Sequence, residues 1–405
     1  MVCSGKEGGR RRRSAIMFFG NKRLALLVII YIGFISLGLP DNILGVAWDS
    51  MRTEFGVPVY YAGFISTLLT LCSAVSAFFS GAILRRLGTG KLLVICGFMT
   101  GCGLLGYALS PFFRVLLLFA VPLGFGQGAI DTGMNYFVAR HYTSRDMNWL
   151  HCCWGIGASA GPLMITLILS AGWSWRCGYG IVSAVQLCLA GLFLMTLNLW
   201  KETGTGGDGG RAEAFEGKVR YSLRFFCCPL MMFLYCGAEY SLGLWGYLFL
   251  TQCRGYSPEA AGYAVTGYWG MLTFGRFLLG FIANRLGNTR QIRFSTLLGL
   301  AGAVLLLSDL PFLPAAALGL IGFAFATFYP AMMHAAPERF DDATAATVIG
   351  YQGGAAMLGI ALLPAGFGYL ASVFSFDLLP YFAGGVCALL FLIQWKVDGS
   401  GRSRA

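Results

Sequence analysis

Apolar runs recur along almost the whole chain and are separated by short polar turns. A helix needs about 20 mostly apolar residues to cross the hydrocarbon core of a bilayer, whereas the strands of a membrane barrel alternate apolar and polar positions in shorter segments. These runs are long and do not alternate. The predicted helices are 24–48, 60–84, 91–109, 115–139, 147–172, 176–200, 223–248, 257–283, 291–308, 312–334, 343–367 and 373–395. We therefore expect an all-α membrane protein with twelve transmembrane helices.

The two halves of the chain repeat each other at matching positions. Residues 81–88 (GAILRRLG) end the second predicted span, and residues 280–287 (GFIANRLG) end the eighth, at an offset of 199. Gly161 of the fifth span matches Gly359 of the eleventh at an offset of 198. Internal repeats of this kind build transporters in which two bundles alternate access to a site between them. The sequence therefore predicts two pseudo-symmetric six-helix bundles.

The repeat and the polar stretches divide the chain into five parts. These are a basic tail at 1–22, a first bundle at 23–200, a linker at 201–222, a second bundle at 223–395 and a tail at 396–405. The loops on one side hold 24 of the 29 Lys and Arg residues, those on the other side hold four, and Arg276 lies within a span. Loops rich in Lys and Arg stay in the cytoplasm. We expect a multi-pass protein of the plasma (inner) membrane with both termini cytoplasmic.

Composition supports this assignment and narrows the class of protein. Apolar residues make up 57% of the chain and charged residues 12%, against about 25% charged residues in soluble domains. The spans leave no room for a catalytic or nucleotide-binding domain, which argues against an enzyme and an ATP-driven pump. The net charge of +11 follows the loops and does not indicate nucleic acid. Without metal-ligand spacing or a cofactor motif, we expect no metal, no cofactor and a monomer in the lipid bilayer.

Ionisable residues inside the predicted spans are few, and each costs about 2.5–3.5 kcal/mol on insertion scales. Gln127, Asp131 and Asn135 recur at every fourth position of the fourth span, so they share one helix face. Asp131 lies nine residues from Arg140 at the end of that span, which places it near the bilayer centre. We interpret Asp131 as a proton-binding carboxyl beside a solute. The alternative is an interhelical hydrogen bond that only stabilises packing.

Three further charged residues lie within spans. Asp41 follows Pro40, which removes a backbone hydrogen bond and should kink the first span. A carboxylate beside broken backbone is typical of a transporter site, and a local helix cap is the alternative. Glu239 is either a further proton-coupling site or the partner of Arg276. Arg276 lies within two turns of the end of its span, so its charged head alternatively extends to the interface.

Aromatic rings and amides in several spans are typical of a sugar site, because rings stack on the apolar face of a sugar and amides bond its hydroxyls. Aromatic residues in membranes more often pack or anchor at the interface. A histidine in such a span is either a proton relay or a hydrogen-bonded core residue. The candidate solute-binding residues are Asn135, Gln127, Trp154, His151, Trp245, Trp269, Tyr351 and Gln352.

The twelve spans, the 6+6 repeat and the basic turn at 81–88 resemble the major facilitator superfamily. Arg85 and Asn284 occupy the places where that family usually has an acidic residue. The resemblance covers nearly the whole chain and implies the fold of that family, with a solute site between the two bundles.

Two short stretches, 39–44 (LPDNIL) and 130–138 (IDTGMNYFV), resemble the fucose permease branch of this superfamily. In that branch, carboxylates at these two places carry protons and a following asparagine helps to bind sugar. The resemblance therefore implies proton roles for Asp41 and Asp131 and a sugar role for Asn135. The branch typically has Glu where this chain has Asp131.

We therefore expect a secondary active transporter, a symporter that imports a sugar or a similar small polar solute with protons by alternating access. One alternative is a proton-antiporting exporter of drugs or metabolites, which would have a broad apolar and aromatic cavity. Another is a membrane sensor that does not transport. The short linker and tail give such a sensor little with which to signal.

Overall fold

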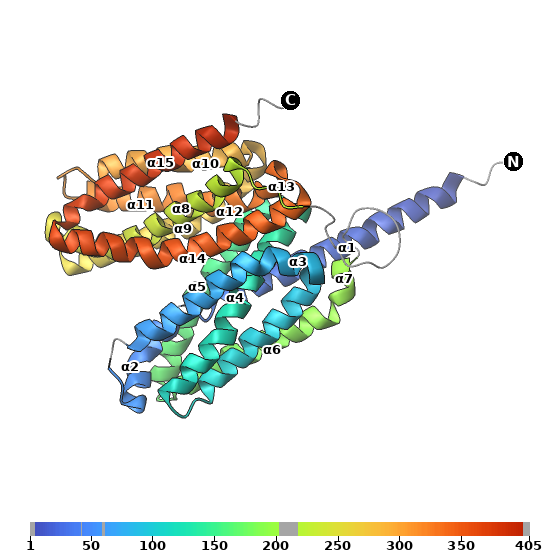
Figure 1. Ribbon diagram of the computed structural model, residues 1–405, viewed down its shortest axis with the longest axis horizontal. Helices are drawn as coiled ribbons and strands as arrows, with labels where there is room; N and C mark the ends of the chain where they lie inside the picture. The colour runs from blue at the N-terminus through green and yellow to red at the C-terminus, as the bar shows by residue number, and fades with distance from the viewer. Residues whose placement is uncertain (1–4, 42, 59–60, 202–217, 400–405) are drawn as a thin grey trace.

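The computed structural model describes residues 5–41, 43–58, 61–201 and 218–399 (Figure 1). Most of the predicted linker at 201–222 lies outside these residues, as do the outer ends of the two predicted tails. The regular elements of the described part are helices.

The first half of the chain contains α1 (Gly5–Gly38), α2 (Ile43–Phe55), α3 (Tyr61–Ala108), α4 (Phe113–His141), α5 (Ser144–Ser170), α6 (Trp175–Met195) and α7 (Leu197–Lys201). The second half contains α8 (Leu223–Leu248), η1 (Phe249–Cys253), α9 (Pro258–Leu286), α10 (Asn288–Leu305), α11 (Leu313–Phe325), α12 (Phe328–His334), α13 (Ala336–Arg339), α14 (Asp342–Val373), η2 (Phe376–Leu378) and α15 (Leu379–Gly399).

Nine helical segments of the described residues are long and apolar enough to cross a membrane. The longest, α3, has 48 residues and is broken at Gly88, so it supplies two spans. Two further long helices, α9 with 29 residues and α10 with 18, bring the number of spans to twelve. The prediction of a multi-pass all-α protein with two six-helix bundles is confirmed.

The internal repeat is visible in the backbone. Gly88 has φ 73° and ψ 163°, and its counterpart Gly287 has φ 72° and ψ 157°. A residue with a Cβ rarely adopts a positive φ, so both turns require glycine. Gly161 of α5 packs against the backbone that follows α1, and Gly359 of α14 packs in the same way against α8. The matching glycines in the sequence therefore mark matching bends and close contacts.

The two bundles meet at one end and diverge towards the other (Figure 1). α3 packs against α14, and α5 packs against α9. We call the end where the bundles meet the basic end, because the turns that carry Arg85, Arg145 and Arg285 lie there. The start of α1 and the end of α15 lie on this side as well (Figure 1).

At the opposite end, an ion pair ties each bundle to itself. In the first bundle, Arg176 at the start of α6 lies 2.6 Å from Glu54 at the end of α2. In the second, Arg254 after η1 lies 2.6 Å from Asp377 of η2. The two pairs join corresponding loops of the repeat with the signs of the charges exchanged. Each pair joins two loops of the same bundle, and neither pair connects one bundle to the other.

The first predicted span is divided in the structure. α1 ends at Gly38 and α2 begins at Ile43, with a turn at 39–41. Pro40 has no N–H to continue the helix, so the predicted kink is confirmed. The turn allows the carboxylate that follows Pro40 to leave the helix surface.

The predicted span at 312–334 agrees with the membrane-length segment Leu313–His334, but its helical hydrogen bonding is interrupted, because α11 ends at Phe325 and α12 begins at Phe328. Pro330 lies four residues after Ala326 and cannot donate to its carbonyl oxygen. That oxygen instead accepts a hydrogen bond of 3.4 Å from Nε of Arg276 on α9. The proline therefore breaks the helix and frees an acceptor for a buried charge.

Candidate functional site

Asp131 of α4 lies where helices of both bundles meet. Its Oδ1 accepts a hydrogen bond of 3.0 Å from Nδ2 of Asn135, one turn further along α4. Its Oδ2 accepts a hydrogen bond of 3.5 Å from the hydroxyl of Tyr329 on α12. Gly353 of α14 also faces it, since a Cβ there would lie 3.9 Å from Oδ2. The half-buried carboxylate of the first bundle is therefore approached by two helices of the second.

The amide of Asn135 is buried and bonded at both ends. Its Nδ2 donates to Asp131, and its Oδ1 lies 3.1 Å from Nε2 of His151 on α5. An amide oxygen only accepts, so Nε2 of His151 carries the hydrogen in this arrangement. The ring centre of His151 lies 4.7 Å from that of Tyr329. Each of the four residues therefore contacts two of the others. We call Asp131, Asn135, His151 and Tyr329 the Asp131 quartet.

The contacts within the quartet affect the predicted roles of Asn135 in solute binding and of His151 in proton relay. Asn135 is 0% exposed, and its amide already donates to the side chain and backbone oxygen of Asp131 and accepts from His151, so a direct bond to a solute requires the quartet to rearrange. His151 is hydrogen-bonded in the core and, through Asn135, is linked to a carboxyl. The role of Asn135 in solute binding stays a prediction.

Asp41 forms a second group with two other predicted residues. It lies in the turn between α1 and α2, and its side chain is exposed. Its Oδ2 accepts a hydrogen bond of 2.8 Å from Nε1 of Trp154 on α5, and its Oδ1 accepts one of 3.4 Å from Nε2 of Gln127 on α4. Gln127 lies one turn from Asp131 on the same face of α4. The structure therefore brings the two carboxylates predicted to bind protons to neighbouring positions.

Arg276 is buried between the bundles. It is 4% exposed, and its Nη2 lies 3.8 Å from Oε1 of Glu239 on α8. The alternative that it extends to the interface is therefore wrong, because a carboxylate and the carbonyl oxygen of Ala326 hold its charge inside the protein. Its guanidinium carbon lies 5.9 Å from the ring centre of Trp154 in the first bundle. Arg276 of the second bundle thus lies near Trp154, the residue that donates a hydrogen bond to Asp41 in the first bundle.

Two of the predicted solute-binding residues serve packing away from these groups. Nε1 of Trp245 donates a hydrogen bond of 2.8 Å to the carbonyl oxygen of Pro364. The ring of Tyr351 lies between those of Phe78 and Phe225, with both centroids 5.3 Å away. The geometry gives no support to a solute contact by either residue in this conformation.

Two more predicted residues lie within the packing of the second bundle. The ring of Trp269 contacts those of Tyr240 and Tyr268, with centroids 5.5 and 5.1 Å away. Gln352 is buried, and its Nε2 donates to the carbonyl oxygen of Met332 at 3.4 Å. Their roles as solute ligands stay predictions.

The sequence pattern does not single out Tyr329, although it supplies the second bundle's hydrogen bond to Asp131. The available signal was Pro330, because a proline inside an apolar run predicts a break beside it. Without the fold, nothing indicated which residue of the other bundle would face the break.

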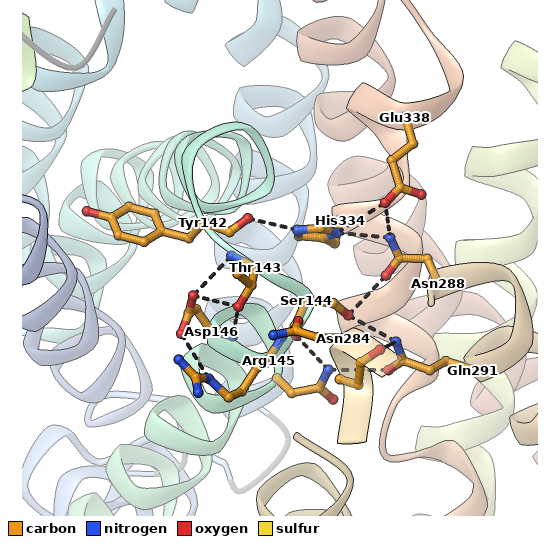
Figure 2. Close-up of polar contacts among 12 residues, drawn as sticks. Tyr142, Thr143, Ser144, Arg145, Asp146, Asn284, Asn288, Gln291, His334 and Glu338 are labelled. Atoms are coloured by element: carbon orange, nitrogen blue, oxygen red, sulfur yellow. Dashed lines mark hydrogen bonds and ion pairs between the residues drawn. The ribbon is translucent and has the colours of Figure 1, made fainter. Parts of the chain in front are cut away.

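Polar contacts join the bundles at the basic end, as Figure 2 shows. At the start of α5, Oγ of Ser144 donates to Oδ1 of Asn288 at 3.1 Å and accepts from Nε2 of Gln291 at 3.0 Å. The next backbone N–H, that of Arg145, donates to Oδ1 of Asn284 at 2.9 Å. Uncharged amide and hydroxyl groups therefore hold α5 against the second bundle.

His334, at the end of α12, extends the same set of contacts (Figure 2). Its Nε2 lies 3.0 Å from the carbonyl oxygen of Tyr142, and its Nδ1 lies 2.9 Å from Nδ2 of Asn288. Nδ2 of Asn288 also donates to Glu338 at 2.8 Å. A neutral imidazole with its hydrogen on Nε2 satisfies both bonds. We call Tyr142, Ser144, Arg145, Asn284, Asn288, Gln291 and His334 the basic-end latch.

The two places where the resembling family usually has an acidic residue also contact the opposite bundle. Nη1 of Arg85 donates to Oγ1 of Thr347 at 2.6 Å, and Asn284 belongs to the basic-end latch. An ion pair nearby does join the bundles by charge, because Nη1 of Arg140 lies 2.7 Å from Asp342. In the described part of the chain, the guanidinium of Arg85, uncharged hydrogen-bonding groups and the ion pair between Arg140 and Asp342 thus hold the bundles together at the basic end.

The chain is similar to known membrane transporters. A family model for the Major Facilitator Superfamily matches residues 30–307 and 227–402. The cis,cis-muconate transport protein of Acinetobacter baylyi is 26% identical over 383 residues, which cover 88% of this chain and 91% of that protein. The glucose/mannose transporter GlcP of Bacillus subtilis is 26% identical over 239 residues, which cover 55% of this chain and 59% of that protein.

Two solved structures have a similar fold. The transporter FucP in its outward conformation superposes with a TM-score of 0.77 at 14% identity, covering 93% of this chain and 99% of that one. The proton:xylose symporter XylE, bound to 6-bromo-6-deoxy-D-glucose, superposes with a TM-score of 0.73 at 13% identity, covering 93% and 96%.

Proposed function

Since this chain belongs to the Major Facilitator Superfamily and is a secondary transporter, we propose that it carries a small polar solute together with protons by alternating access. The observation that supports this most is the position of Asp131. Its carboxylate lies at the bundle interface and is bonded from both bundles, so a change in its charge alters a contact that the transport cycle has to break. Asp41 accepts a hydrogen bond from Gln127, which lies one turn before Asp131 on α4, and it is the second proton-binding group of the proposal.

A sugar is the solute that we propose first. Asp41 is exposed beside the indole of Trp154 and the amide of Gln127, which is the mixture of ring and hydrogen-bonding groups that binds sugars. The relative from Bacillus subtilis is a glucose/mannose transporter, and the similar fold of XylE belongs to a xylose symporter. These likenesses support a sugar without identifying it.

An organic anion is the second candidate, and Arg276 is the observation that favours it. A guanidinium group can form two parallel hydrogen bonds with a carboxylate. The distance of 3.8 Å between Arg276 and Glu239 is longer than a hydrogen bond, so the guanidinium has donors left for an anion. The relative from Acinetobacter baylyi transports muconate, a dicarboxylate. In this case protonation of Asp41 and Asp131 would remove the negative charges that repel the anion.

Uptake into proteoliposomes tests the proposal and separates the candidates. Labelled hexoses, pentoses and dicarboxylates are offered with and without a pH gradient that is acid on the outside. We expect one sugar to accumulate several-fold with the gradient and only to equilibrate without it. Accumulation of a dicarboxylate alone would select the second candidate, and a gradient that drives solute out would indicate the exporter. Equal uptake with and without the gradient would rule out proton coupling.

We also propose that the basic end faces the cytoplasm, because 24 of the 29 Lys and Arg residues are predicted on that side. In a background without the 13 native cysteines, single cysteines are placed in the linker at 201–222 and in the loop at 49–59. An impermeant thiol reagent added to intact cells should label the loop and leave the linker unlabelled until the cells are opened. Labelling of the linker in intact cells would reverse the orientation.

A further inference from the structure

α12 connects the candidate proton site to the contacts that close the basic end. This helix has seven residues, Phe328–His334. Tyr329 near its start donates to Oδ2 of Asp131, and His334 at its end contacts Tyr142 and Asn288 in the basic-end latch. Five residues of helix cover about 7.5 Å, so one short rigid element joins the two places.

Short turns mark both ends of α12, and most of its residues are buried. Ala326 and Thr327 separate it from α11, since Pro330 breaks the helical hydrogen bonding there. Ala335 separates it from α13. A displacement of Tyr329 along this short helix would therefore move His334 as well.

The bond between Tyr329 and Asp131 depends on the charge of the carboxyl. An ionised carboxylate accepts hydrogen bonds roughly twice as strong as those of a neutral acceptor. Gly353 approaches the same oxygen without a polar side chain, so the hydroxyl of Tyr329 is the polar group from the second bundle that contacts Asp131 among the described residues. Protonation of Asp131 therefore weakens a bond between the bundles.

We propose that Tyr329 senses the protonation of Asp131 and, through α12, holds the basic-end latch closed while Asp131 is ionised. Proton binding would loosen α12 and allow the basic end to open. This inference rests on the proposed proton coupling at Asp131. It assigns a coupling role to a residue of the second bundle that does not itself bind the proton.

Other titratable groups surround Asp131 and would contribute to any dependence on pH. They are Asp41 before α2, His151 on α5, Glu239 and Cys236 on α8, and Arg276 on α9. At the latch, His334 lies 3.8 Å from Glu338 and belongs to the same set. The test therefore compares variants that change only the hydroxyl of Tyr329 or only the charge of Asp131.

In a background without the 13 native cysteines, the closed state can be measured with spin labels on Arg86→Cys and Arg285→Cys, two exposed positions at corresponding places on the basic end. In the absence of solute, we expect the protein with native Tyr329 to be closed at high pH and to open as the pH falls. Tyr329→Phe keeps the ring against His151 and removes the hydroxyl. It should raise the ratio of open to closed protein at high pH about fivefold and flatten its response to pH. Tyr107→Phe, which removes a buried hydroxyl with no hydrogen-bond partner in the described part, should leave both unchanged.

A second variant keeps the test informative. Asp131→Asn should be open-shifted at all pH values, and adding Tyr329→Phe to it should change little, because both act on one bond. If Tyr329→Phe leaves the pH response intact while Asp131→Asn removes it, the inference about Tyr329 fails and the proton role of Asp131 stands. If Asp131→Asn itself keeps the native pH response, the proposed function fails at this residue.

Discussion

Asp131→Asn is expected to abolish accumulation of solute against its gradient while preserving exchange of solute across the membrane. The amide resembles the protonated carboxyl and has no proton to release, so the loaded carrier can reorient but cannot complete a coupled cycle. One proton moving through 100 mV supplies about 2.3 kcal/mol, which supports roughly a fortyfold accumulation. That ratio should fall to about one in the variant.

Accumulation and counterflow in the same vesicles decide the outcome. Asp309→Asn is the matched control, because it removes an exposed carboxylate from a loop outside the spans. Asp131→Ala should lose both activities if the carboxyl also positions Asn135 for the solute. Accumulation by Asp131→Asn at the level of the unmodified protein would assign Asp131 a structural role and direct attention to Asp41.

Removing one partner of the Glu239–Arg276 pair is expected to cost about 3–5 kcal/mol of folding stability, because it leaves a buried charge uncompensated. The two single variants should differ. In Glu239→Gln the guanidinium keeps its charge, since arginine does not lose its proton in proteins. In Arg276→Gln the remaining Glu239 can bind a proton and become neutral. We therefore expect Glu239→Gln to be the less stable of the two.

Thermal unfolding in detergent, measured on both single variants and on the double variant, checks this order. Glu239→Gln combined with Arg276→Gln should recover much of the loss, because no charge is then left alone. The same experiment separates the two predicted roles of Glu239. If Glu239→Gln is as stable as the unmodified protein but cannot accumulate solute, Glu239 is a proton site and the ion pair contributes little.

The features that the sequence predicts well are those set by local spacing. Twelve long apolar runs predict twelve spans, and the matched positions of Gly88 and Gly287 predict a repeated turn whose backbone angles agree within a few degrees. The four-residue spacing of Gln127, Asp131 and Asn135 predicts one helix face, and all three take part in the polar contacts around the two carboxylates.

Contacts between distant parts of the chain were beyond such reasoning. Tyr329 lies 198 residues from Asp131 in the sequence, and only the packing of α12 against α4 brings them together. The pairing of Arg276 with Glu239 was one of two alternatives, because distance from the end of a span does not show what faces the residue. Trp245 and Tyr351 are residue types that often line sugar sites. The sequence alone does not distinguish an aromatic ring that packs in the core from one that binds a ligand.

The basic-end latch consists mainly of bonds between uncharged amide, hydroxyl, imidazole and backbone groups. Dissolved ions screen exposed charges beyond about 8 Å at physiological ionic strength and have little effect on such neutral bonds. Two charged contacts beside the latch also join the bundles: the bond from Arg85 to Thr347, and the pair between Arg140 and Asp342, in which the side chain of Asp342 is 55% exposed. Added salt should weaken that pair and leave the rest of the contact in place, so the balance between open and closed basic ends would stay nearly constant when the salt content of the surroundings changes.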